Sequence, residues 1–282
     1  MDYKTKRNLL ARSFQDALNI INNDEVLTNS VEQTRTHTEI LTDWKDMSVE
    51  LHDNLENYNI SVVNGRTLEV ASYYARRGYN VTVLNFASAT HPGGKVVDGS
   101  SAQEESLCRI STLYPCLNTI ECMNKFYKPH RIALKNHMPG TPKWYSDDII
   151  YTPNIMVFRD DTDIPIGKSL HHLQCYDVNV ITCAAPNMIQ VDTDIYADEL
   201  DEVLTKRIIH ICETAVCVDT DVLILGAFGC GVFNNPPHIV ANAFRKVLSD
   251  SKYNRFNLVI FAIVNDGKGR DNFEVFSDIL TK

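Results

Sequence analysis

Residues 81–105 read VTVLNFASATHPGGKVVDGSSAQEE, and this stretch decides the fold class. Its apolar, β-branched beginning predicts a buried strand over Asn80–Phe86. The strand runs into a turn with Gly93 and Gly94, and we expect a helix to begin near Ser101. A strand, a glycine-containing loop and a helix in this order predict an α/β sheet, in which the loops at the carboxyl ends of the strands form the ligand crevice.

The same alternation continues to the end of the chain. An amphipathic helix is predicted over Asp198–Val216, and another follows Pro236 and Pro237. Five more apolar runs predict strands, at Ile60–Val63, Ile155–Phe158, Asn179–Ala184, Asp221–Leu225 and Asn257–Val264. The core of the protein is therefore expected to be α/β from about residue 59 to residue 282.

The preceding segment has a different pattern. Two helix-like stretches, Arg7–Asn22 and Ser30–Tyr58, contain few glycines or prolines. We therefore expect residues 1–58 to form a helical extension packed on a core domain of residues 59–282. Within that domain, the proline-rich stretch Phe126–Ser146 is predicted to be a long surface loop.

Composition narrows the possible environments and partners. The chain has 282 residues and 44% hydrophobic content, without a secretory leader pattern or an apolar run long enough for a membrane span. Its eight cysteines form no CxxC pair, which indicates reduced thiols in the cytoplasm. A formal charge of −9 argues against general nucleic-acid binding. We expect a cytoplasmic monomer without membrane contact or cofactor. We also expect no metal site, because the histidines lack the spacing of metal ligands.

The run Gln103-Glu104-Glu105 has two interpretations. Ser101 and Glu104 fit a capping box, and acids in a first helical turn complement the helix dipole. A capping box does not require the upstream Gly93-Gly94 turn, however, whereas a site that holds a phosphate beside a carboxylate would use it. The context therefore favours a catalytic site, although the capping role can coexist with it.

A second glycine-rich loop follows another predicted strand. Residues 221–237 read DVLILGAFGCGVFNNPP, with Gly226, Gly229 and Gly231 ahead of a helix start. The spacing fits neither the dinucleotide-binding nor the Walker pattern. It is typical of a phosphate-binding loop, or of a tight corner without a ligand, and two such loops on one sheet favour a diphosphate held between them.

Three segments together resemble the microbial-type poly(ADP-ribose) glycohydrolases, a branch of the macrodomain superfamily. They are NFASATHPGGKVVDGSSAQEESLCRISTLY, YSDDIIYTPNIMVFRDD and LILGAFGCGVFNNPPHIVANAF. The resemblance spans roughly residues 60–282. It implies a three-layer α/β/α fold with a mixed sheet, and hydrolysis of ADP-ribosyl linkages in a crevice between the two loops, with ADP-ribose or an ADP-ribosylated protein or polymer as the partner.

The resemblance also implies roles for individual residues. Glu105 would be the catalytic general acid and base, Glu104 would bind the ribose hydroxyls, and Gln103 would support the loop. Asn85 would contact the reacting ribose. The phosphate loops and a stacking aromatic would be supplied by Gly93, Gly94, Gly229, Gly231 and Phe233.

One position departs from the family pattern. Lys95 stands where the family has its third glycine, so it could add a cation beside the diphosphate, crowd the loop, or point into solvent. A crowded loop would favour a mono-ADP-ribosyl hydrolase that acts on a single modified side chain or nucleobase. A binding module that only reads ADP-ribose is the other alternative, but it would not need the Gln-Glu-Glu run.

Other candidate residues have a simpler interpretation. Cys108 lies in an apolar context, where burial would raise the pKa of a thiol, and His91 adjoins the glycine turn without a catalytic partner. The acids Asp160, Asp161 and Asp163 follow a strand and are typical of a solvated turn. Phe273 and Phe276 could adjoin a base-stacking pocket, but their helical spacing predicts core positions.

Overall fold

The computed structural model describes residues 2–42, 59–162, 164–165, 171–265 and 272–281. Its centre is a mixed seven-stranded sheet with the order β1-β4-β5-β3-β6-β7-β2. Strands β5, β3, β6, β7 and β2 are parallel, and β4 and β1 extend the sheet antiparallel at one edge. The strands are β1 (Glu39–Leu41), β2 (Asn59–Val63), β3 (Val81–Phe86), β4 (Ile149–Val157), β5 (Tyr176–Cys183), β6 (Val222–Leu225) and β7 (Leu258–Ala262).

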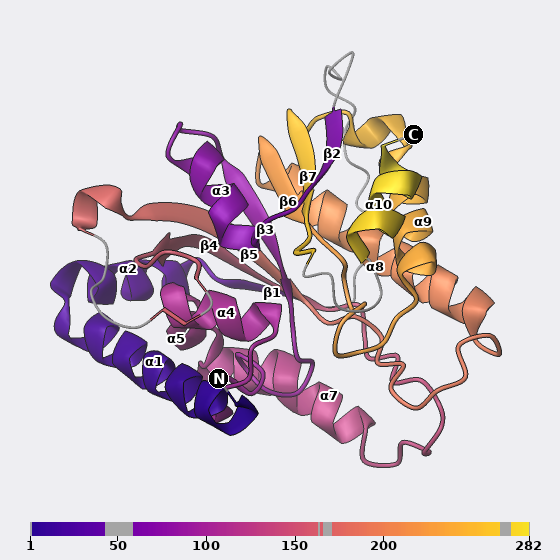
Figure 1. Cartoon of the computed structure of the whole chain (residues 1–282), viewed down its shortest axis with the longest axis horizontal. Coiled ribbons are helices and arrows are strands. Elements are labelled where there is room, and N and C mark those ends of the chain that lie inside the picture. Colours follow the sequence, from indigo (N-terminus) through magenta and orange to yellow (C-terminus); the bar gives the residue numbers. More distant parts are fainter. Residues whose placement is uncertain (1, 43–58, 163, 166–170, 266–271, 282) are drawn as a thin grey trace.

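Helices cover both faces of this sheet (Figure 1). One layer contains α8 (Ala197–Cys217), α9 (Pro237–Leu248) and α10 (Asn272–Leu280). The other layer contains α1 (Tyr3–Asn23), α2 (Glu25–Thr36), α3 (Thr67–Ala75), α4 (Gln103–Ile110) and α5 (Leu113–Leu117). Shorter segments are η1 (Val96–Asp98), α6 (Ile120–Cys122), η2 (Met123–Tyr127), α7 (Lys128–Ala133), η3 (His172–Gln174) and η4 (Ser251–Tyr253).

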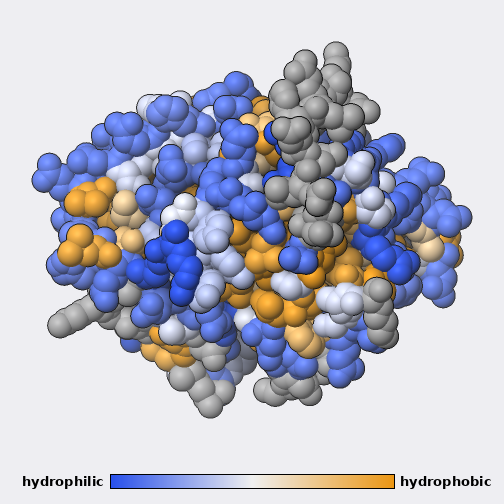
Figure 2. Space-filling view, turned by 90° about the horizontal axis from the view of Figure 1, so that it is seen from above, coloured by the Kyte–Doolittle hydropathy of each residue, from blue (hydrophilic) through white to orange (hydrophobic). Residues whose placement is uncertain are grey.

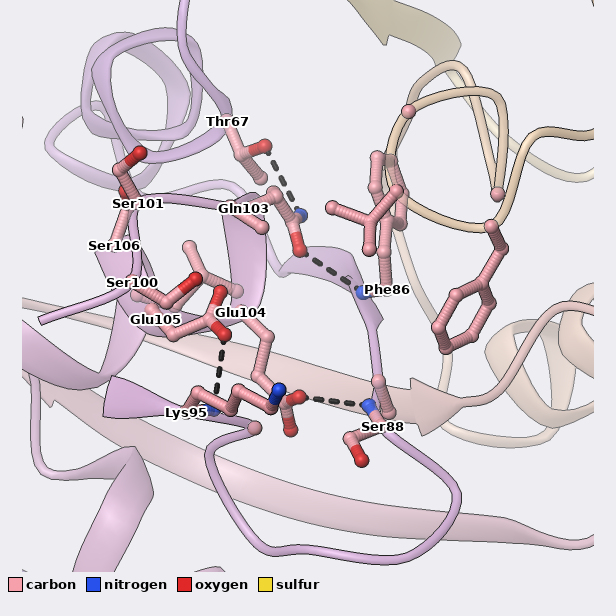
Figure 3. A pocket seen from close by; sticks show the side chains of 18 of the residues that line it. Thr67, Phe86, Ser88, Lys95, Ser100, Ser101, Gln103, Glu104, Glu105 and Ser106 are labelled. Atoms are coloured by element: carbon pink, nitrogen blue, oxygen red, sulfur yellow. Dashed lines mark hydrogen bonds between the residues drawn. The ribbon is translucent and has the colours of Figure 1, made fainter. Parts of the chain in front are cut away.

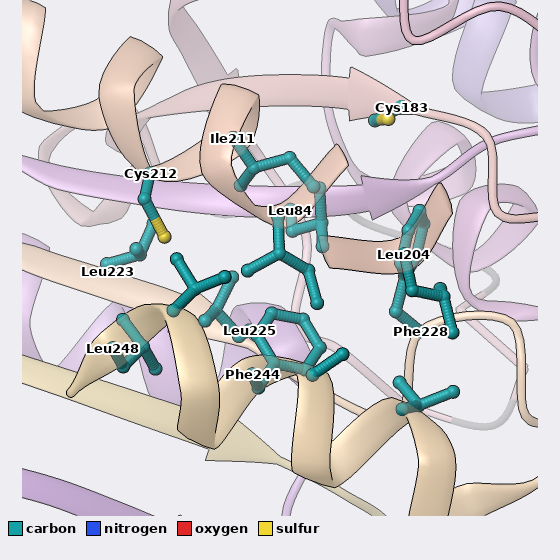
Figure 4. Packing of buried hydrophobic residues seen from close by; sticks show 14 of the residues in the cluster. Leu84, Cys183, Leu204, Ile211, Cys212, Leu223, Leu225, Phe228, Phe244 and Leu248 are labelled. Carbon is teal, nitrogen blue, oxygen red and sulfur yellow. The ribbon is translucent and has the colours of Figure 1, made fainter. Parts of the chain in front are cut away.

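Alternation along the strands builds the two cores. In β3, Val83 faces the cluster under α1–α5, whereas its neighbour Leu84 faces the cluster under α8 and α9. The same change of face occurs between Val180 and Ile181 in β5, as expected for a sheet buried on both sides. Figure 4 shows Leu84 packed with side chains of α8 and α9, among them Phe244. The predicted α/β/α architecture with a mixed sheet is confirmed.

The N-terminal segment is more varied than predicted. Helix α1 matches the first predicted helix, but the second ends at Thr36, and Glu39–Leu41 forms an edge strand against β4. Phe14 and Val31 belong to the same hydrophobic cluster as β3. Residues 43–58, the rest of the predicted helix, lie outside the described residues. The division of the chain at residue 58 stays a prediction.

The stretch predicted as a surface loop is partly helical and partly buried. Residues up to Ala133 form η2 and α7, and Phe126, Tyr127 and His130 are buried. Pro129 lies at the start of α7, directly after the π-helical segment η2, so the helical run continues past the proline instead of ending there.

The distribution of surface residues and the burial of the cysteines are those of an ordinary globular protein. Seen from above, hydrophobic residues gather in the middle of the face and hydrophilic residues surround them (Figure 2). Among the described residues no disulfide joins the eight cysteines, and the packing role is confirmed for the six that are buried. Among the described helices, none combines the length and the apolar character that a membrane crossing requires.

Candidate active site

The two predicted glycine loops line one cavity of about 810 Å³. Residues that follow β2, β3, β6 and β7 contribute to its wall, so the cavity lies at the carboxyl ends of the parallel strands. Its members include Gly94, Lys95 and the whole run Gln103–Glu105 from the first loop and helix, and Gly229, Gly231 and Phe233 from the second loop. The sequence thus predicted which two loops meet.

Gln103 fastens helix α4 to the end of β3. Its Nε2 donates to the Leu84 carbonyl at 2.7 Å and to Thr67 Oγ1 at 3.2 Å, and its Oε1 accepts from the Phe86 N–H at 2.9 Å (Figure 3). All polar atoms of this amide are therefore engaged. These bonds fix the first turn of α4, and with it the two glutamates that follow, relative to the sheet.

Glu104 is a buried carboxyl with both oxygens bonded. Its Oε2 accepts from the Ser88 N–H at 2.7 Å, and its Oε1 lies 3.5 Å from Asn85 Nδ2. Burial raises the pKa of this carboxyl to about 8, and the adjacent Glu105 acts in the same direction, while the Ser88 N–H opposes it. Glu104 therefore carries its proton at neutral pH.

Glu105 is held by only one of its oxygens. Its Oε1 accepts from the Lys95 N–H at 3.0 Å, whereas the buried Oε2 has no hydrogen-bond partner among the residues that the structure describes. The residue is 6% exposed and lines the cavity. Of the two neighbouring acids, Glu105 is thus the one with an uncommitted oxygen.

The loop approaches Glu105 so closely that a glycine is required. Gly94 has a φ of +60°, and a Cβ built there would lie 2.6 Å from Glu105 Oε1. Gly93 has a φ of +67° and packs on the other side, where a Cβ would meet the Tyr114 ring at 2.8 Å. Gly94 thus leaves room for the Glu105 carboxylate, and Gly93 leaves room for the Tyr114 ring.

The capping interpretation of Ser101 and Glu104 is wrong. Helix α4 has Ala102 at its N-cap, and no side chain caps the helix. Both glutamates instead turn toward the loop after β3 (Figure 3). A local capping box and a helix start whose acids are used in tertiary contacts have the same sequence signature, so only the fold separates them.

Two predicted site residues lie behind the cavity wall. Asn85 is fully buried and donates to Thr182 Oγ1 at 3.1 Å in addition to Glu104, and it does not line the cavity. Gly93 is also absent from the wall. The geometry gives Asn85 a contact with Glu104, and its expected contact with the reacting ribose stays a prediction.

The second loop presents backbone groups to the cavity. Gly229 has a φ of +74°, and a Cβ there would lie 2.5 Å from Ala185 Cβ. The buried Asn235 braces the turn, since its Nδ2 donates to the Gly229 and Pro186 carbonyls. The N–H groups of Gly231 and Val232 donate to no residue in the described part of the chain. Half-buried Phe233 completes this wall.

Lys95 is exposed and lines the cavity, and it forms no ion pair with any residue that the structure describes. Its φ of −110° suits any L residue, so the backbone at this position does not require the glycine that the family has there.

The remaining candidate residues pack in the core or lie at the edge of the cavity. Burial raises the pKa of the Cys108 thiol well above its ordinary value, as predicted for a packing cysteine. Burial and the nearby Arg131 and Lys95 lower the pKa of His91, which lies at the rim. Phe276 is buried in the core, against Phe261. No cluster of His, Cys, Asp or Glu suited to a metal ion occurs among the described residues.

Several wall residues were not predicted. Gly65, Arg66 and Thr67 follow β2, and the rule that ligands bind at the carboxyl ends of strands could have indicated them. Asp161 accepts from the Leu68 N–H at 3.3 Å and pairs with Arg66 at 3.8 Å, and burial raises its pKa to about 6. It therefore holds the start of α3, in contrast to the predicted solvated turn. Asp163 lies outside the described residues. Tyr3 and Arg7 of α1 also line the cavity, without any local signal.

This arrangement, a mixed sheet between helices with a glycine-lined cavity at its carboxyl edge, defines a macrodomain-like protein. A family model described as the microbial-type PARG catalytic domain matches residues 14–160, where PARG denotes poly(ADP-ribose) glycohydrolase. The chain belongs to the microbial-type poly(ADP-ribose) glycohydrolase family, whose members are glycoside hydrolases.

Solved structures agree with this assignment. Poly(ADP-ribose) glycohydrolase from Thermomonospora curvata bound to the inhibitor ADP-HPD is 30% identical with a TM-score of 0.78, covering 97% of this chain and 98% of that one. The Deinococcus radiodurans enzyme in complex with ADP-ribose is 27% identical with a TM-score of 0.69, covering 89% and 96%. No curated protein matches the chain.

Proposed function

We propose that this protein hydrolyses the ribose glycosidic bond of poly(ADP-ribose) or of ADP-ribosylated targets, with Glu105 as the general acid and base. Membership of a glycohydrolase family supports the reaction class. The single observation that carries the assignment of Glu105 is its buried Oε2, which has no partner among the described residues although the residue lines the cavity.

ADP-ribose would lie across the two loops. Backbone N–H groups near Gly231 attract the diphosphate without any net positive charge, which suits a chain whose formal charge is −9. Phe233 offers a ring for stacking. The ribose would then reach α4, where the glutamates lie, and the two loops would supply positioning more than chemistry.

Cleavage at the anomeric carbon passes through an oxocarbenium-like state. Glu105 Oε2 would donate a proton to the leaving oxygen as the glycosidic bond breaks. The same oxygen would then take a proton from the water that attacks the anomeric carbon, so the acid is regenerated in each cycle. Glu104, which is neutral at pH 7, would act as a hydrogen-bonding group for the ribose hydroxyls.

The test is Glu105→Gln. An amide keeps the size of the side chain and an oxygen for the Lys95 N–H, but it cannot transfer the proton. We expect the variant to bind ADP-ribose within about twofold of wild type by calorimetry, and to lose at least roughly 10³-fold in release of ADP-ribose from polymer. Unimpaired hydrolysis would overturn the role of Glu105.

A mono-ADP-ribosyl hydrolase is the second candidate, and Lys95 is the observation behind it. A panel of polymer and of singly modified acidic, arginine, serine and nucleobase substrates separates the two activities. Lys95→Gly should leave polymer hydrolysis intact if the side chain only adds charge. A gain of polymer hydrolysis in this variant would instead assign the native protein to single ADP-ribose groups.

We also propose that the protein is cytoplasmic and monomeric. Eight cysteines without a disulfide among the described residues support a reducing compartment. Fractionation of cells and light scattering of the purified protein test these two points.

A further inference from the structure

The first two turns of helix α1 form part of the cavity wall, although they lie about 90 residues away from the catalytic loop in the sequence. Tyr3 and Arg7 both line the cavity. Arg7 Nε donates to the Asp98 carbonyl at 3.0 Å, and a Cβ at Gly99 would collide with the Arg7 carbonyl. Helix α1 is therefore packed tightly on the segment that leads into α4.

The Arg7 guanidinium is fixed by a single bond and retains donors. Its Nη1 and Nη2 form no hydrogen bond or ion pair with a residue that the structure describes. The group is half-buried and lies 5.8 Å from the centre of the exposed Tyr3 ring. A held guanidinium with free Nη groups beside an aromatic face is suited to an anion that is attached to a flat ring system.

The glutamates lie between this wall and the second glycine loop. Figure 3 shows Ser100, Ser101 and Ser106 on one side of Glu104 and Glu105, with Phe86 on the other side. Phe86 belongs to the second-loop side, because its ring lies 5.8 Å from that of Phe228 and directly against Gly226. Arg7 belongs to the Ser100 side through its bond to Asp98.

We propose that Tyr3 and Arg7 form a subsite for the leaving group, and that its occupant is the next ADP-ribose unit of the polymer. This inference rests on the proposed function, because it places the bond to be cut at Glu105. When one ADP-ribose occupies the two glycine loops, the chain beyond the glycosidic bond runs toward Ser100 and α1. Arg7 then meets a phosphate of that unit and Tyr3 stacks on its base.

Two substrates that differ only in the leaving group test the subsite. The first is poly(ADP-ribose), and the second is an ADP-ribosyl conjugate of a small neutral aryl alcohol. Arg7→Gln should lower kcat/KM for the polymer roughly tenfold at 50 mM salt, through KM, and change the neutral substrate by less than about twofold. The polymer effect should shrink at 0.5 M salt, since exposed charges are screened.

Further variants control for structure. Lys4→Gln removes the same charge from the same helix outside the cavity wall and should change neither substrate. Tyr3→Ser alters a residue that is 76% exposed and should lower polymer kcat/KM several-fold without a change in Tm. It keeps the proposal testable if Arg7→Gln lowers the Tm through its lost bond to Asp98.

The outcomes are distinct from those for Glu105. Equal losses on both substrates, or no loss with Arg7→Gln and Tyr3→Ser, would overturn the subsite. A loss confined to a singly modified acidic peptide, added as a third substrate, would overturn it in favour of a peptide-binding wall. If wild type cleaves none of the substrates, the proposed function fails first. If wild type cleaves the polymer and Glu105→Gln does not, the proposed function stands whatever the α1 variants do.

Discussion

Replacing Glu104 with glutamine should remove a pH dependence of folding stability that the buried carboxyl creates. Its pKa rises from an ordinary 4.5 to about 8 in the folded state, and burial is the main cause. The folded protein therefore binds this proton more tightly than the unfolded chain does. The resulting stability is fully present below pH 4.5 and is lost as the pH rises through 8.

The structure gives the size of the effect. Each pH unit between the two pKa values is worth about 1.4 kcal/mol, so wild type loses on the order of 5 kcal/mol of unfolding free energy between pH 4.5 and pH 8 from this group alone. Glutamine resembles the protonated acid and keeps an oxygen for the Ser88 N–H. The difference in unfolding free energy, Glu104→Gln minus wild type, should therefore rise by roughly 3 kcal/mol from pH 5.5 to pH 7.5.

Urea unfolding at four pH values between 5.5 and 8.5 measures this difference, and the contributions of titrating groups that do not interact with Glu104 cancel in it. Asp98→Asn is the matched control, because it neutralises an exposed carboxylate of the same cavity wall. Its difference from wild type should stay flat. A Glu104→Gln difference that changes by less than about 0.5 kcal/mol over the same range would refute the assignment of a buried, protonated acid.

Two further predictions concern the loops. Gly94→Ala places a methyl group against Glu105 Oε1 at a φ of +60°, so we expect it to lower kcat at least about 100-fold and stability by about 1–2 kcal/mol, and wild-type turnover would contradict the close approach. Gly229→Ala, where a Cβ would lie 2.5 Å from Ala185 Cβ, should cost roughly 2 kcal/mol or more in urea unfolding. Gly231→Ala meets nothing within 4 Å and should stay within about 0.5 kcal/mol of wild type, so equal losses in the two variants would count against the described loop.

Strand periodicity carried most of the fold prediction, and its failures have local causes. Strand β4 was predicted only over its last residues, because Pro153 and Asn154 interrupt the pattern. In the structure the register shifts between Thr152 and Ile155, and Asn154 adopts a φ of +50°, so a bulge lets the strand continue past the proline. The partner strand β1 has three residues, which is too short for any alternation to be recognised.

Some residues of the site are indicated by a local sequence pattern, whereas others reach the cavity only through the tertiary fold. The glycine loops and the Gln-Glu-Glu run can be recognised in the sequence, because they follow the end of a predicted strand closely. Tyr3 and Arg7 reach the cavity only because α1 packs on the segment at Gly99, and nothing in the first ten residues indicates that contact. A prediction of their role requires the tertiary arrangement first.

The two glutamates differ because successive helical residues point about 100° apart. Glu104 is directed to Ser88 and Asn85, where both oxygens are bonded, whereas Glu105 is directed to the Gly94 loop, where one bond leaves the other oxygen available. Residue 95 therefore supports Glu105 through its backbone N–H. Any residue except proline supplies that group, and the φ of −110° at Lys95 suits them all. Lysine in place of the family's third glycine thus leaves this support of the proposed catalytic carboxylate unchanged. We expect the lysine side chain to act on the side of the loop that faces the substrate.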